Sequence, residues 1–182
     1  MLLGLGVKDG PYWDYLANRA REALKDPSPV PFDFDGRGEY SKKFIDWANK
    51  HHKSGKDAII YSMTVSVVPI AELIPPKDPR AIPILREALQ ADNVIIQTTA
   101  AKGLAALHDT ASIPAIIHAC QSSPKEGAEM IAEPLVFFSD PAAQHAVDLY
   151  VPEEMAKELR EAVAQGKTPF NLGSDRADAP PH

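Results

Sequence analysis

The sequence predicts an all-α fold in which pairs of helices stack as a solenoid. Three aspartates, Asp78, Asp109 and Asp140, open three similar stretches that begin 31 residues apart in a chain of 182 residues. Apolar residues recur at fixed positions relative to each aspartate, which is typical of a repeat array rather than a single closed core. Within each stretch they also follow the spacing of one helix face.

Five apolar positions align among the stretches, nine and five residues before the aspartate and four, seven and eleven residues after it. The aligned residues are Pro69, Ala100 and Ile131; Leu73, Leu104 and Leu135; Ile82 and Ile113; Leu85, Ile116 and Val147; and Leu89, Cys120 and Val151. Because a single helical pair cannot bury both of its faces, we expect neighbouring pairs to bury them together.

Each unit is predicted to contain two helices. The first begins at the aspartate, since Asp-Pro at 78–79 and at 140–141 is typical of an N-cap followed by proline at the first helical position. The second helix of the central unit is expected over about residues 93–107. Its apolar face contains small residues such as Ala100 and Gly103, which would let neighbouring helices approach closely.

Prolines are expected to bend these helices without ending them. Pro83 and Pro114 lie one turn into the first helices, whereas Pro69 and Pro134 lie inside the second helices. A proline in a helix interior costs about 3 kcal/mol and normally kinks the helix. The apolar positions on both sides of each proline nevertheless keep their spacing.

The segments DPRAIPILREAL and AAKGLAALHD resemble HEAT repeats, in particular the short phycobilisome-lyase-like form, over about residues 55–151. The resemblance implies a right-handed α-α superhelix in which the second helices line the concave side. Tetratricopeptide and ankyrin repeats have similar periods, but their characteristic residues are missing from this sequence.

We expect one domain over residues 1–166. It would consist of a degenerate repeat with an insertion (1–54), the HEAT-like repeats (55–151) and a capping helix (152–166) that ends at a glycine. Residues 167–182, which have little apolar surface to bury, are expected to form a flexible tail.

The amino-terminal segment is rich in aromatic residues: Tyr12, Trp13, Tyr15, Phe32, Phe34, Tyr40, Phe44, Trp47 and Tyr61. They predict a local aromatic core at the end of the stack or, alternatively, a face that binds a partner or ligand.

Asp9 is expected to open the degenerate unit, with Trp13 and Leu16 at its apolar positions. Residues 33–39 lack two ligands of a calcium loop, so Asp35-Gly36 favours a tight turn.

The composition argues against nucleic acid as the main partner. The net charge is −6 at pH 7 and no basic stripe occurs, whereas phosphate binding needs clustered Lys and Arg. No apolar run is long enough to span a membrane, and the apolar residues 1–7 lack the basic flank of a signal peptide. A cytoplasmic location is therefore expected.

No catalytic residues, cofactor site or metal site are predicted. Cys120 occupies an apolar repeat position and is expected to be a buried, inert thiol. The six histidines include no His-Glu pair of the kind found in di-iron HEAT-repeat enzymes. Neither a hydrolase nucleophile elbow nor a phosphate-binding glycine loop is present.

The predicted function is a noncatalytic scaffold that binds a protein partner, alone or as one section of a larger protein. The side chains expected off the core stripe of the second helices, where a partner would bind, are Val67, Ile70, Gln97, Thr98, Lys102, Glu129 and Glu133. Two alternatives remain: an enzyme or chaperone of the bilin-lyase type, and a module that binds a small regulatory ligand at the aromatic segment.

Overall fold

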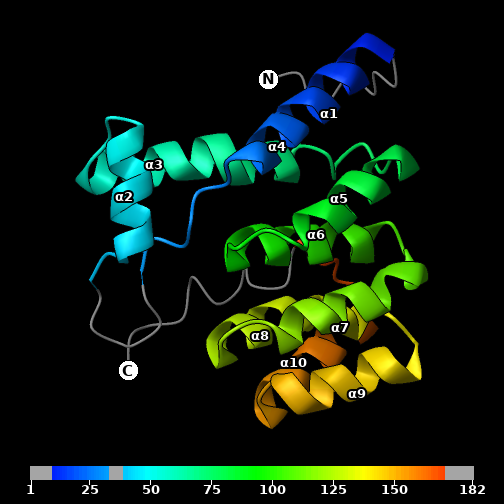
Figure 1. Ribbon diagram of the computed structural model, residues 1–182. Helices are drawn as coiled ribbons and strands as arrows, with labels where there is room; N and C mark the ends of the chain where they lie inside the picture. The colour runs from blue at the N-terminus through cyan, green and yellow to red at the C-terminus, as the bar shows by residue number, and fades with distance from the viewer. Residues whose placement is uncertain (1–9, 33–38, 171–182) are drawn as a thin grey trace.

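The computed structural model describes residues 10–32 and 39–170, which form helices, turns and one isolated bridge between Phe32 and Tyr40 (Figure 1). The helices are α1 (Gly10–Lys25), α2 (Lys42–Lys50), α3 (Gly55–Ser62), η1 (Met63–Val67), α4 (Val68–Ala71), η2 (Pro79–Ala81), α5 (Ile82–Ala88), α6 (Val94–Ala106), η3 (Thr110–Ser112), α7 (Ile113–Gln121), α8 (Lys125–Ala132), η4 (Glu133–Phe137), α9 (Pro141–Tyr150) and α10 (Glu153–Ala164). The prediction of an all-α fold is confirmed for these residues.

The helices form successive pairs, which are stacked from α1 at the top of Figure 1 to α9 and α10 at the bottom. Helix α1 packs on η1 and α4, α5 on α6, α7 on α8, and α9 on α10. Neighbouring pairs meet through α1 and α5, α6 and α8, and α7 and α9. The 31-residue period of the sequence therefore corresponds to one helical pair in the stack.

The aligned apolar positions form the core of this stack. At three of them every member is at most 4% exposed: Leu73, Leu104 and Leu135; Leu85, Ile116 and Val147; Leu89, Cys120 and Val151. A further aligned set, Ala81, Ser112 and Ala143, was not noticed in the sequence, yet each member is completely buried. One apolar cluster runs from Trp13 and Leu16 in α1 to Leu159 in α10, so each pair is buried by its neighbours.

Asp78 and Asp140 cap first helices as predicted. The Asp78 carboxylate accepts a hydrogen bond from the N–H of Arg80 at 2.9 Å. Asp140 accepts bonds from the N–H groups of Ala142 and Ala143 at 2.8 and 3.2 Å. These carboxylates satisfy backbone donors that have no partner within the helix.

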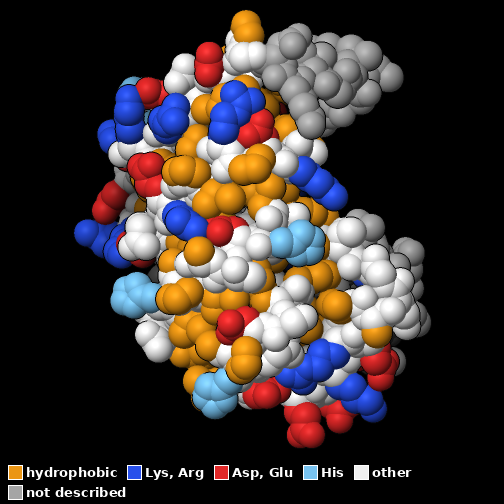
Figure 2. Space-filling model, turned by 90° about the vertical axis from the view of Figure 1, so that its right-hand side faces the viewer, with side chains coloured by type: hydrophobic (Ala, Val, Ile, Leu, Met, Phe, Trp, Pro, Cys, Tyr) orange, Lys and Arg blue, Asp and Glu red, His pale blue; other side chains and the backbone are white. Residues whose placement is uncertain are grey.

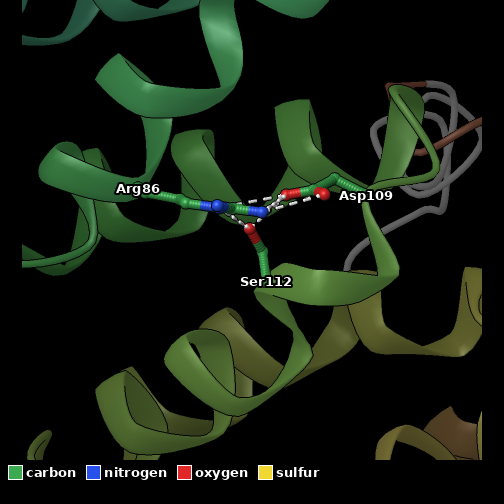
Figure 3. Close-up of polar contacts among 3 residues, drawn as sticks. All are labelled: Arg86, Asp109 and Ser112. Atoms are coloured by element: carbon green, nitrogen blue, oxygen red, sulfur yellow. Dashed lines mark hydrogen bonds and ion pairs between the residues drawn. The ribbon is translucent and has the colours of Figure 1, made fainter.

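Asp109 forms a joint between two helical pairs instead of a cap (Figure 3). Its carboxylate accepts hydrogen bonds from Nη2 of Arg86 at 2.7 and 3.0 Å and from the hydroxyl of Ser112. Arg86, which lies on α5, also donates from Nε to the Ser112 oxygen at 2.6 Å. Charge-assisted bonds of this kind hold the start of one unit against the preceding unit.

The second helices continue through their prolines by changing helix type. The run from α3 to α4 passes through η1, a π-helical segment in which the N–H of Val68 bonds to the carbonyl of Met63, and Pro69 follows directly. Pro134 lies near the start of the 3-10 segment η4, which follows α8 without a gap. The helices are thus not broken, as expected, although the sequence did not indicate the π or 3-10 geometry.

The insertion after α1 is held by an aromatic cluster. The rings of Phe32, Tyr40, Phe44, Trp47 and Tyr61 follow one another at centroid separations between 5.1 and 6.1 Å. Phe44 and Trp47 are buried, which favours the local aromatic core over an open binding face. The turn predicted at Asp35-Gly36, the residues 1–7 and Asp9 lie outside the described residues.

The last helix ends the stack and is followed by a packed segment. Ala156 and Leu159 of α10 are buried, and the helix ends at Gly166 with a φ of 79°. The N–H of Lys167 bonds to the carbonyl of Ala162 at 3.0 Å, as in a Schellman motif. Pro169 is then buried. Residues 167–170, which were predicted to begin a flexible tail, place Pro169 in the interior and leave Thr168 and Phe170 exposed. Residues 171–182 lie outside the described residues.

Candidate functional site

A groove with a volume of about 400 Å³ crosses the ends of the second helices. Its walls come from the chain after α4, the end of α6, the end of η4 and the segment after α10. We call it the repeat groove; it is lined by Ala71, Ile74, Pro75, Lys77, Ala105, Ala106, His108, Phe137, Lys167, Thr168, Pro169 and Phe170. Ligand sites usually measure roughly 300–1,000 Å³, so the groove is large enough to hold a ligand or part of a partner.

The groove follows the repeat of the sequence. Pro75, Ala106 and Phe137 are 31 residues apart and therefore hold the same position in three successive units. Ile74 and Ala105, one residue earlier in two of these units, are 3% and 1% exposed and form its floor. Stacking thus joins residues from three units into one apolar strip that no single unit could make.

Two basic side chains stand beside the apolar strip, again at one repeat position. Lys77 and His108 both adopt left-handed backbone conformations, with φ of 49° and 53°, and both side chains are exposed. Each follows the end of a second helix, where a cation complements the negative end of the helix dipole. None of the residues that line the groove is acidic, although the chain carries a net charge of −6.

The segment after α10 closes the groove from the other side. Gly166 turns the chain back, and the next four residues lie opposite the ends of the second helices. Pro169 is buried there, while Phe170 remains 50% exposed. This wall therefore belongs to the last part of the described chain and not to a repeat.

The side chains predicted to contact a partner do not line the repeat groove. Lys102, Glu129 and Glu133 are half-buried on α6, α8 and the start of η4. The Gln97 side chain instead links α6 to the end of α5, because its Nε2 donates a hydrogen bond to the carbonyl of Leu89 at 3.1 Å. None of these four lines the repeat groove.

Three of the predicted positions are wrong because their side chains are in the interior. Val67 and Thr98 are each 7% exposed, and Ile70 is completely buried. The central second helices have neighbours on several sides, so positions away from the main apolar stripe are also covered. The hydroxyl of Thr98 is buried and has no hydrogen-bond partner among the described residues.

The residues that line the groove were not predicted from the sequence. Pro75, Ala106 and Phe137 share a repeat position, and that spacing was the available signal. The three side chains differ in size and chemistry, however, so the position did not stand out as an apolar column. The basic residues Lys77 and His108 immediately precede Asp78 and Asp109, and they too share a repeat position.

Another hollow of about 530 Å³ lies near the aromatic cluster and is lined by Tyr15, Arg19, Asp26, Trp47, His51 and Tyr61, among others. Its Arg19 and Asp26 are already paired: Arg19 pairs with Glu72, and Asp26 binds Lys50 at 2.7 Å and His51 at 3.2 Å. The hydrogen bond from Lys50 holds the pKa of Asp26 below its usual value. These pairs join α1 to α2 and α4, which is a structural role.

The molecular surface shows no dominant charge on the face drawn in Figure 2. Lys and Arg are mixed with Asp and Glu, and apolar side chains are exposed between them. Among the helices that the structure describes, none combines the length and the apolar character needed to cross a membrane.

Comparison with known proteins identifies one region of the chain. No curated protein and no solved structure matches the chain significantly. Residues 96–122, which cover most of α6 and all of α7 and include Asp109 of the joint, match the family model of the PBS lyase HEAT-like repeat. The resemblance to short HEAT-like repeats predicted from the sequence is confirmed over this segment.

Proposed function

We propose that the protein is a noncatalytic scaffold, a right-handed α-solenoid of HEAT-like pairs that binds a protein partner in the repeat groove. The observation that carries this proposal is that the groove is lined by the same repeat position of three successive units. Pro75, Ala106 and Phe137 come from three units and meet in one apolar strip. A surface shared by several units is the usual binding surface of repeat proteins.

The chemistry of the groove supports a partner with apolar side chains. The walls are mainly Ala, Ile, Pro and Phe, and the basic groups are confined to Lys77, His108 and Lys167. Burying apolar side chains of a partner here would stabilise the complex by about 25 cal/mol for each Å² removed from water. The polar groups would fix the orientation of the partner.

Affinity capture with matched variants tests this proposal. The purified full chain, Lys77→Glu, Ala106→Glu and the control Lys157→Glu would each be immobilised and exposed to extract of the source cell. Lys77 and Lys157 are both exposed, so their reversal should leave the fold intact. We expect one or more proteins to be retained by the wild type and Lys157→Glu but lost with both groove variants. Equal retention by all four chains would contradict the proposal.

A second candidate is a bilin-binding enzyme or chaperone. Two observations favour it: the description of the matching repeat and the apolar groove of about 400 Å³. A tetrapyrrole needs a long apolar pocket, which the groove could supply. Mixing the purified chain with a bilin should then shift the visible absorption band, and Ala106→Glu should remove the shift. An unchanged spectrum with the wild type rules this candidate out.

A further inference from the structure

We propose that the repeat groove recognises an extended acidic segment with an apolar anchor, and that residues 167–170 of this chain compete with that segment for the groove. The inference rests on the proposed scaffold function and adds the chemistry of the partner and the means by which binding is limited.

The repeat spacing defines the form of the partner segment. Helices that pack against each other lie about 8–10 Å apart, and an extended chain advances about 3.3 Å per residue. Residues about three positions apart in an extended partner segment would therefore contact successive units of the groove. An extended segment can place its anchor over Ala106 or Phe137 while its neighbours reach the adjacent unit.

The basic residues define the charge of the partner segment. Lys77 and His108 lie in two successive units, immediately beside the apolar strip, and neither is paired with a carboxylate among the described residues. A lysine ammonium and an imidazole N–H both donate to carboxylates. Two acidic residues separated by two others would thus meet both groups, with the apolar anchor between them.

The chain itself supplies the competing segment. Thr168, Pro169 and Phe170 follow the last helix and form one wall of the groove, with Pro169 buried and Phe170 half-exposed. The segment has a proline and an aromatic anchor but a lysine, Lys167, in place of an acid. It therefore covers part of the apolar strip but offers no carboxylate to Lys77 and His108, which an acidic competitor would provide.

Peptide binding to the full chain tests the inference. The probe is fluorescein-labelled Gly-Asp-Pro-Phe-Asp-Gly, and its controls are Gly-Lys-Pro-Phe-Lys-Gly, which reverses the charge, and Gly-Asp-Pro-Ser-Asp-Gly, which removes the anchor. Fluorescence anisotropy would be measured with the wild type, Phe170→Ser and Lys77→Glu. Phe170 and Lys77 are both exposed, and circular dichroism would verify that each variant is folded.

We expect Phe170→Ser to bind the acidic probe about five- to tenfold more tightly than the wild type, because one competing anchor is lost. Lys77→Glu should bind it about two- to fivefold more weakly, the change expected for the loss of one exposed ion pair. Both control peptides should bind more weakly than the probe. Equal binding of the acidic and basic peptides, or no effect of Phe170→Ser, overturns the inference. If the partner capture above still depends on the groove, that result removes the inference alone and leaves the proposed function.

Discussion

At the scale of single residues, Asp109 is held more tightly than a capping aspartate. Its side chain is 11% exposed and binds both Arg86 and Ser112, which belong to adjacent helical pairs. Arg86 is 42% exposed, so part of its charge remains in contact with water. The joint therefore stabilises the fold through hydrogen bonds to a nearly buried carboxylate more than through the ion pair itself.

Replacing Asp109 by alanine should lower the free energy of unfolding by about 1.5–3 kcal/mol, the range for hydrogen bonds that involve charged groups. Urea denaturation followed by circular dichroism measures this change. Lys25→Ala, which breaks the exposed pair of Lys25 with Glu22, serves as control and should change stability by less than about 1 kcal/mol. Equal losses in the two variants would show that the joint contributes nothing special.

Gly103 of α6 lies close to α5 and to the turn after α4. A Cβ atom at this position would lie 2.9 Å from Cδ1 of Leu85 and 3.1 Å from Cγ1 of Ile74, both in the core. Gly103→Ala should gain at most about 1 kcal/mol in helix propensity and lose about 1–3 kcal/mol to overpacking. Thermal unfolding should show a lower Tm, whereas Gly10→Ala, with no atom within 4 Å of the new Cβ, should not. A raised Tm for Gly103→Ala would refute the close packing.

Cys120 is the single cysteine of the chain and is 1% exposed. Burial raises the pKa of its thiol to about 12. The native thiol should therefore resist iodoacetamide at pH 8, whereas the unfolded thiol, with a pKa of about 8.5, should react. Because the native state keeps the proton, stability should fall as the pH rises through about 8.5. Rapid alkylation of the folded chain, measured by mass spectrometry, would contradict this assignment.

At the scale of helices, two N-caps with different surroundings should differ in their contribution to stability. Asn93 caps α6 through the N–H groups of Ile95 and Ile96 and also donates to the carbonyl of the buried Ser28 at 2.6 Å. Asp140 caps α9 and makes no comparable bond to a distant segment in the structure described.

Asp140→Ala should lower the free energy of unfolding by about 1 kcal/mol, the typical loss for a cap. Asn93→Ala should lower it by about 2–4 kcal/mol, because it also leaves the Ser28 carbonyl without its donor. Chemical denaturation of both variants measures the difference. A loss for Asn93→Ala no larger than that for Asp140→Ala would mean that the bond to the insertion adds nothing.

The repeat pattern predicted the helices and core well, because both depend on local spacing. The second helix expected over 93–107 corresponds to α6, and the aligned leucines at 73, 104 and 135 are completely buried. The π segment before Pro69 was not predictable, since it depends on how the chain replaces one missing backbone donor.

The candidate site was harder to predict than the fold. The burial of Thr98 depends on helices from neighbouring units, and the groove depends on where each second helix ends. Both are properties of the stack. Neither is a property of one helix, so a pattern read along one helix could not reveal them.

At the scale of the whole molecule, stacking in register creates the repeat groove. Ala106 of α6 alone presents little apolar surface. Stacking brings it into the same groove as Pro75 and Phe137, which hold the same repeat position in the neighbouring units. The order of the helical pairs in Figure 1 therefore determines both the continuous core and the groove. A change in register between any two units would separate the residues of the apolar strip.

Photo-crosslinking from position 137 tests this arrangement most directly. Phe137 would be replaced by p-benzoylphenylalanine, which preserves an aromatic side chain, and the irradiated monomer would be analysed by mass spectrometry. Stacking in register predicts crosslinks to the residues that share the groove with position 137, namely Ile74, Pro75, Lys77, Ala105, Ala106, His108 and residues 167–170. Crosslinks confined to the helices of its own pair would contradict it.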